Sequence, residues 1–220
     1  MEKKISEETL KTKLKYLCLG SFLFIAPLTM QNINAQTPVN VNTSVHFGKE
    51  DLQQPMTSMM NRIYTIKMTG DFDKDYVAIM NEFQQGGIDL CKIYEMSGED
   101  PKLLENAKIS AVELKEDQKI LKTFANKEIK TTTTQKEPND LMQSLNNMMK
   151  GVEQVGKTGN LNNDYASIML MYNWANIEMA KSELHYGHNT ALKNRAAGIV
   201  EEFSCHESSL TEWLDKIVEK

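Results

Sequence analysis

The hydrophobic positions of the chain follow helical spacing from about residue 51 onward. Between residues 73 and 97 the apolar positions recur at intervals of three or four, which is the spacing of one face of a helix. These positions are Tyr76, Ile79, Met80, Phe83, Gly87, Leu90, Cys91 and Tyr94. A second stripe follows at Leu103, Ala107, Ser110, Leu114, Leu121 and Phe124. No segment alternates as a half-buried strand does, so the pattern predicts an all-α fold.

The same pattern occurs twice, at a constant offset of 89 positions. Thr69-Gly70 and Asp75-Tyr76 return as Thr158-Gly159 and Asp164-Tyr165. Such self-similarity indicates a duplicated structural unit. We therefore expect residues 51–127 to form repeat 1 and residues 140–220 to form repeat 2. Residues 128–139, rich in threonine and containing Pro138, cannot continue a helix and are expected to be a linker.

Each repeat is predicted to contain a short helix and a long helical hairpin. The expected helices are 51–67, 73–97 and a third from 101 in repeat 1, then 140–156, 162–186 and the C-terminal segment in repeat 2. Gly98 is expected at the helix C-cap, with Asp100 and Pro101 starting the next helix. Tandem hairpins with one apolar face each can bury those faces together. They are expected to form a four-helix bundle with extra short helices.

The first 35 residues have the order of a secretory signal peptide. Three lysines at positions 11, 13 and 15 precede an apolar run at 16–30, and Ala35 offers a cleavage site. That run is shorter than the roughly 20 residues that span a bilayer. The alternative is an amphipathic first helix of the mature fold. Residues 36–50 are polar and are expected to be a flexible lead-in. We predict a periplasmic or otherwise extracytoplasmic protein without a membrane anchor in the mature chain.

Charge and cysteine content limit the binding partners and the disulfide bonds that are expected of the chain. Removing residues 1–35, which carry five lysines and three glutamates, leaves 20 basic and 27 acidic residues, a formal net charge of about −7. An acidic chain without a basic stripe is not expected to bind nucleic acid. Two cysteines, Cys91 and Cys205, remain, so a disulfide framework is not expected. Their places on different helix faces argue against a bond between them.

The repeated motif resembles a known bacterial family. The relevant residues are Thr69-Gly70-Asp71-Phe72-Asp73-Lys74-Asp75-Tyr76, then Met80, then Gln85-Gly86-Gly87-Ile88-Asp89-Leu90. They resemble the domain-of-unknown-function 305 family, and the resemblance covers nearly the whole mature chain, once per repeat. It implies ferritin-like helical hairpins, many of them exported, some associated with copper binding and copper resistance. The family's His-His pair falls on Phe83-Gln84 and on Tyr172-Asn173, none of which is a useful copper ligand. Both copies are therefore interpreted as degenerate metal sites.

Asp117 and His206 occupy equivalent places in the two repeats, on the apolar stripe of the last helix. A charged group on a core face needs a partner. One interpretation pairs the two residues with each other at the bundle centre. The other is a remnant metal site that adds a nearby thioether. We favour the structural pair, because one His and one Asp are too few ligands for tight binding.

Methionine is abundant, with twelve of fourteen in the mature chain. The candidates for a soft-metal site are Met59, Met60, Met148 and Met149. Thioethers bind Cu(I), but methionine at helical spacing is more typical of core filling. Core filling is the preferred interpretation, and copper as a cofactor is the alternative.

Two acidic groups have simpler explanations. The spacing of Asp71, Asp73 and Asp75 imitates a calcium loop, but Tyr76 stands where that loop needs glycine. Helix capping is therefore expected of these residues. Asp89 and Glu178 lie opposite the apolar stripe and are expected on a solvated face.

No catalytic motif is present: the sequence has no nucleophile elbow, HExxH, phosphate loop or dinucleotide fingerprint. We predict an exported, non-catalytic helical-bundle protein that serves as a binding or structural module. The alternative is a periplasmic copper-binding protein with Met, His, Cys and carboxylate ligands. A protein partner or a metal ion is left open as the binding partner.

Overall fold

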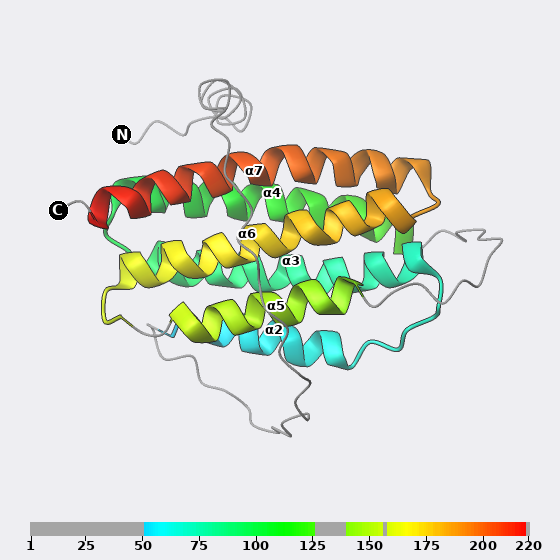
Figure 1. The fold of residues 1–220 in the computed structure, drawn as a ribbon, viewed down its shortest axis with the longest axis horizontal. Helices are drawn as coiled ribbons and strands as arrows, with labels where there is room; N and C mark the ends of the chain where they lie inside the picture. Colours follow the sequence, from blue (N-terminus) through cyan, green and yellow to red (C-terminus); the bar gives the residue numbers. More distant parts are fainter. Residues whose placement is uncertain (1–50, 126–139, 156–157, 219–220) are drawn as a thin grey trace. The chain divides into compact units, whose positions relative to one another are not determined.

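The computed structural model describes residues 51–125, 140–155 and 158–218. Its helices are α2 (Gln54–Tyr64), α3 (Phe72–Ser97), α4 (Pro101–Ala125), α5 (Asp140–Val155), α6 (Leu161–Tyr186) and α7 (Thr190–Val218). All regular structure within these ranges is helical (Figure 1), so the all-α prediction is confirmed. Helix α2 is shorter than the helix expected over residues 51–67. The expected signal peptide, lead-in and linker lie outside the described residues.

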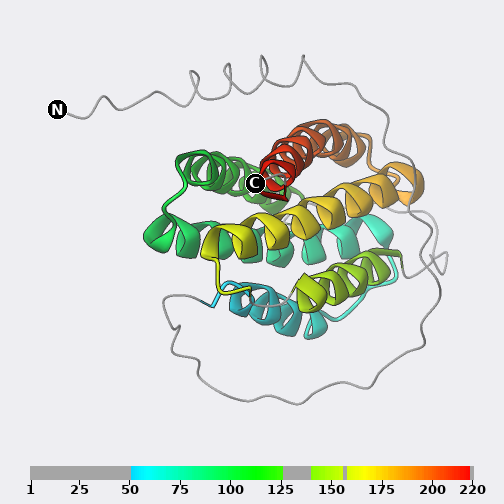
Figure 2. The same cartoon turned by 60° about the vertical axis from the view of Figure 1, so that its left-hand side comes forward.

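The described helices belong to one compact unit and form three layers of two (Figures 1 and 2). Helices α3 and α6 make the middle layer. On one side α4 packs on α3 and α7 packs on α6, and on the other side α2 packs on α3 and α5 on α6. The two hairpins, α3–α4 and α6–α7, together make a four-helix bundle, and α2 and α5 are the extra short helices. Among the described helices, none is both long and apolar enough to cross a membrane.

The middle helices are covered from two sides, which a single apolar stripe did not predict. Sixteen of the 26 residues of α3 are buried, against eight of the 25 in α4. Polar side chains on α3 and α6 are therefore placed in the interior as well as apolar ones. This double coverage positions the site described below.

The repeated Thr-Gly turn is held by the first turn of the helix that follows it. The carboxylate of Asp75 accepts hydrogen bonds from the N–H and hydroxyl of Thr69, at 2.8 and 2.7 Å. Asp164 accepts the same two bonds from Thr158, at 2.9 and 2.6 Å. Gly70 and its counterpart in repeat 2 both have φ of 80°, a conformation that favours glycine. The conserved spacing of the two copies therefore encodes a structural turn.

The glycines that end α3 and α6 serve a different purpose from the one expected. Gly98 is the C-cap residue of α3, as predicted, and Gly187 is the C-cap residue of α6. Both are extended, with φ of −75° and −64°. Glycine is required there for space. A Cβ on Gly98 would lie 2.5 Å from the ring of Tyr94, and one on Gly187 would collide with the carboxyl group of Glu183. In each repeat the side chain four residues earlier folds back over the cap.

Candidate functional site in the bundle interior

The two hairpins meet at a stacked aromatic pair. Phe83 of α3 and Tyr172 of α6 occupy equivalent places in the repeats, and their ring centroids are 4.2 Å apart with planes at 5°. The hydroxyl of Tyr172 donates to the carbonyl of Phe83 at 3.3 Å. The two rings fill the space between the central helices.

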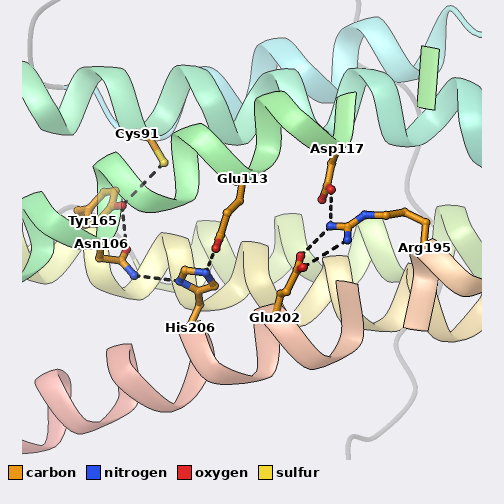
Figure 3. A network of polar contacts seen from close by, with 8 residues as sticks. All are labelled: Cys91, Asn106, Glu113, Asp117, Tyr165, Arg195, Glu202 and His206. Atoms are coloured by element: carbon orange, nitrogen blue, oxygen red, sulfur yellow. Dashed lines mark hydrogen bonds and ion pairs between the residues drawn. The ribbon is translucent and has the colours of Figure 1, made fainter. Parts of the chain in front are cut away.

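A buried polar network joins side chains of the two hairpins (Figure 3). Nε2 of His206, a side chain only 3% exposed, lies 2.7 Å from a carboxylate oxygen of Glu113. Its Nδ1 is 3.5 Å from the amide nitrogen of Asn106. The amide oxygen of Asn106 accepts a hydrogen bond from the hydroxyl of Tyr165 at 3.1 Å, and Cys91 Sγ lies 3.9 Å from that hydroxyl. Side chains from α3, α4, α6 and α7 all contribute to this first cluster.

A second cluster contains the ion pairs of Arg195. Its guanidinium contacts the carboxylate of Asp117 and also that of Glu202, the latter at 2.6 Å. Burial raises the pKa of Asp117 to about 7, and the Glu202 carboxylate raises it as well, although the Arg195 guanidinium lowers it. The charges of Glu183, Asp117 and Arg195 act on the hydroxyl of Tyr76. Its pKa is raised, chiefly by burial.

The two clusters are the same arrangement in two versions. At the 89-residue offset, Asn106 corresponds to Arg195, and Asp117 corresponds to His206. Both Asp117 and His206 are buried, as predicted, but the expected bond between them is not formed. Each contacts a different residue of the opposite repeat, Arg195 for Asp117 and Glu113 for His206. The cause is Arg195, a cation at a position where repeat 1 has a neutral amide.

The ends of the central layer carry polar residues at equivalent positions. The hydroxyl of Tyr94 donates to the side-chain oxygen of Asn162 at 2.6 Å. The counterparts of these residues are Glu183 and Asp73, two fully buried carboxyl groups. Burial raises the pKa of Glu183 to about 9, and the Asp73 carboxylate adds to this shift. The Tyr94–Asn162 bond joins the end of α3 to the start of α6, and Asp73 at the start of α3 accepts from His188 just after the end of α6, so these two helices run antiparallel.

Three amide side chains in the middle layer are fully buried. Gln84, Asn173 and Asn176 are each 0% exposed. None of their amide nitrogens or oxygens has a hydrogen-bond partner among the described residues. A buried amide without a partner costs free energy of folding.

The methionines named as metal candidates lie in the outer layer. Met59 and Met148 are fully buried, Met60 is 4% exposed, and Met149 is half-buried. They belong to α2 and α5, across the middle layer from Asp117 and His206 (Figure 2), so the fold does not bring the two sets together. Within the described ranges, no group of three or more His, Cys, Asp and Glu side chains is arranged to hold a metal ion.

The three aspartates of the calcium-like spacing point to three separate partners. Asp71 accepts a hydrogen bond from the N–H of Lys74 at 3.3 Å, which is the predicted cap. Asp75 holds the Thr-Gly turn, and Asp73 reaches the N–H of His188 at 2.8 Å. They do not form a shared cation site.

The remaining sequence expectations concern exposed acids and cysteines. Asp89 and Glu178 are about one third exposed, at 32% and 34%, and each pairs with the lysine three residues later. Cys91 is a free, fully buried thiol, so it is not bonded to Cys205. Burial raises the pKa of the Cys91 thiol to about 12, which keeps it protonated and unreactive.

Sequence reasoning did not single out several residues that carry these contacts: Glu113, Asn106, Arg195 and Glu183. A signal was present in the offset comparison, because Arg195 replaces an amide and Glu183 replaces a tyrosine between copies. Charged residues that replace neutral ones at a duplicated interior position indicate an edited contact.

The chain matches no known family model, no characterised protein and no solved structure. The family resemblance of the repeated motif therefore stays a prediction.

Proposed function

We propose that the chain is an exported, non-catalytic helical-bundle module of the domain-of-unknown-function 305 type. In this proposal its interior polar groups have a structural role and join the two repeats, and binding takes place elsewhere on the molecule. The observation that carries the proposal is that the buried polar contacts cross between repeats. They are Asp117–Arg195, Glu113–His206, Asn106–Tyr165 and Tyr94–Asn162, together with Asp73 and the N–H of His188.

Two further observations support a structural role over soft-metal binding. The imidazole of His206 is engaged on both ring nitrogens, by Glu113 and by Asn106. Met59 is packed so tightly on α3 that a Cβ on Gly86 would lie 2.6 Å from its sulfur. A metal would need both kinds of side chain to leave these contacts, at the cost of core packing.

The test is an anaerobic titration of residues 36–220 with Cu(I) against a competing chelator. We expect no binding tighter than micromolar, and the same curve for His206→Ala and for Met59→Leu with Met60→Leu. Met96→Leu is the matched control, because Met96 is 70% exposed and takes no part in the core.

Submicromolar binding that is lost in His206→Ala or in the paired methionine variant would establish the copper-binding alternative. Thermal melts with and without Cu(II) give a second readout, because a ligand that binds only the native state raises the melting temperature. We expect no rise.

A further inference from the structure

The solvent-facing side of α4 carries a row of lysines, which we call the lysine stripe. Its members are all exposed and follow one another at intervals of seven, four and three residues: Lys108, Lys115, Lys119 and Lys122. Those intervals place them on one side of the helix, and at about 1.5 Å per residue the row is about 21 Å long. The sequence analysis expected no basic stripe, and the structure corrects this. The formal net charge of −5 sums over every surface of the chain and hides the stripe.

The lysines of the stripe differ from those on other helices in their ionic contacts. Four lysines on α3, α6 and α7 each pair with a carboxylate three or four residues earlier: Lys74–Asp71, Lys92–Asp89, Lys181–Glu178 and Lys216–Glu212. By contrast, Lys108, Lys115 and Lys119 form no ion pair with a carboxylate in the part of the chain that the structure describes. Their three ammonium groups are therefore available to a partner molecule.

The lysines of the stripe are also close to one another. Lys115 and Lys119 are four residues apart, and Lys119 and Lys122 are three residues apart. Like charges at these spacings destabilise a helix. The helix dipole compensates only Lys122, which lies in the last turn of α4. A local arrangement that costs stability is typical of a functional site.

The second repeat lacks the stripe. At the 89-residue offset, the four lysines correspond to small uncharged residues on α7: Ala197, Ser204, Ser208 and Thr211. The equivalent hairpin therefore folds without lysines at these positions, and the stripe is a feature of repeat 1 alone.

The acidic residues of α4 leave most of this charge uncompensated. Glu113 and Asp117 turn into the bundle and pair with side chains of α7. Glu116 is half-buried, and Glu105, which is exposed, lies one turn before Lys108. Along this side of α4, four exposed positive charges thus stand against one exposed negative charge.

The residue types favour a partner that carries carboxylates. Phosphate groups are bound in bidentate fashion by arginine, and unpaired bases stack on aromatic rings. Helix α4 exposes neither kind of side chain. The two arginines of the chain, Arg62 and Arg195, are engaged in ion pairs. Lysine ammonium groups act as separate point charges, which suits carboxylates at separate positions of a polypeptide.

A narrow partner fits this side of the molecule better than a flat membrane does. Helix α4 shares its outer layer with α7 (Figure 2), and α7 exposes Glu201, Glu212 and Asp215. A flat anionic surface that reaches both helices would bring these carboxylates against its own headgroups. A single segment that lies along α4 avoids them.

We propose that the lysine stripe is a docking surface for an acidic polypeptide segment of a partner protein. The aspartate or glutamate side chains of that segment lie along α4 and pair with the unpaired lysines. This inference rests on the proposed function, in which binding takes place outside the bundle interior.

The test titrates a fluorescein-labelled oligoglutamate peptide with residues 36–220 and follows fluorescence anisotropy. At about 0.1 M salt, where the screening length is about 10 Å, we expect saturable binding. We expect Lys108→Gln with Lys115→Gln and Lys119→Gln to raise Kd by at least about tenfold, because three charge pairs are lost. Salt at about 1 M, where the screening length is about 3 Å, should abolish binding.

The matched control removes three exposed lysines from other helices, Lys150→Gln with Lys181→Gln and Lys216→Gln. Both triple variants have the same net charge, so a net-charge effect would weaken binding equally in the two. Such an equal loss would overturn the proposal. We expect the control to bind the peptide as the wild type does, because its three lysines lie on α5, α6 and α7.

A variant that keeps the charge separates docking from misfolding. Arginine at the same three positions of α4 should bind the peptide as tightly as the wild type does. Glutamine and lysine have similar helix propensities, so thermal melts should show that the glutamine variant is folded. Loss of binding in the arginine variant would contradict a charge-based contact.

Two further probes represent other polyanions: a short DNA duplex, and vesicles of phosphatidylcholine with phosphatidylglycerol. We expect both to bind more weakly than the peptide. Tighter binding of either probe that is lost in the glutamine variant would assign the stripe to nucleic acid or to a membrane and overturn the proposal. Absence of peptide binding would also overturn it. All titrations contain a metal chelator, so such a failure leaves the copper test of the bundle interior unaffected.

Discussion

At the scale of single residues, the repeats conserve interior volume while exchanging chemistry. The hydroxyl of Tyr172, in repeat 2, lies only 2.5 Å from the place that a Cβ on Gly87 would take. The equivalent pair in the other orientation is Phe83 with Asn176. Phe83 lacks the hydroxyl of Tyr172, and opposite it Asn176 has an amide side chain where Gly87 has only a hydrogen. Cores tolerate exchanges that keep total volume, which explains how two copies diverged without losing the stack between them.

The unpartnered amides lead to a prediction at the same scale. Replacing Gln84 by methionine keeps the volume and removes a buried polar group that has no hydrogen-bond partner among the described residues. We expect Gln84→Met to raise the free energy of unfolding in urea by about 1–3 kcal/mol.

The neighbouring Gln85→Met is its matched control. Gln85 donates to Asp89 at 2.9 Å and accepts from Gln118 at 3.3 Å, so its replacement should be neutral or destabilising. A loss of stability in Gln84→Met would mean that the Gln84 amide has a partner in solution, and the prediction would be wrong.

At the scale of helices, the end of each long helix is shaped by the side chain that folds over it. Gly98 has an ordinary φ of −75°, so alanine meets no backbone strain there. The obstacle is the Tyr94 ring, 2.5 Å from the site of a Cβ. We expect Gly98→Ala to lower the free energy of unfolding by about 1–3 kcal/mol through overpacking.

A double-mutant cycle identifies the cause of that loss. In a Tyr94→Leu background the ring is absent, so Gly98→Ala should cost much less, and the coupling free energy should be at least about 0.5 kcal/mol. Additive effects of the two substitutions would show that the glycine is needed for another reason.

Helix periodicity predicted the elements well and the interior less well. The spacing from Tyr76 to Tyr94 placed α3 correctly, because apolar side chains at helical intervals are a local signal. The same signal misses Gln84 and Asn173, since an amide on the second face of a doubly covered helix is indistinguishable from a surface residue. The partners of Asp117 and His206 depend on how the two hairpins dock. That information lies in Arg195 and Glu113, which have no local signature.

At the scale of the whole molecule, the pseudo-symmetric docking of the repeats distributes charge unevenly. The Arg195 cluster holds one cation between two carboxylates, whereas the His206 cluster has an amide and an imidazole in the corresponding places. Each cluster takes residues from both repeats. Neither repeat can therefore satisfy its own interior polar groups, and the bundle requires both copies.

This architecture predicts that one cluster can be converted into the other. Arg195→Asn alone leaves the buried carboxylate of Asp117 without its cation, and we expect it to lower the free energy of unfolding by about 3–5 kcal/mol. Adding Asp117→His copies the arrangement of Asn106, Glu113 and His206 around Glu202. If the two repeats dock with equivalent geometry, the double variant should recover most of the lost free energy of unfolding in urea denaturation at pH 7.5.

Adding Asp117→Leu to Arg195→Asn is the control, because it removes the buried charge without rebuilding the hydrogen bonds. Equal stability of the histidine and leucine double variants would show that only the buried charge matters, and would contradict equivalent docking of the two repeats.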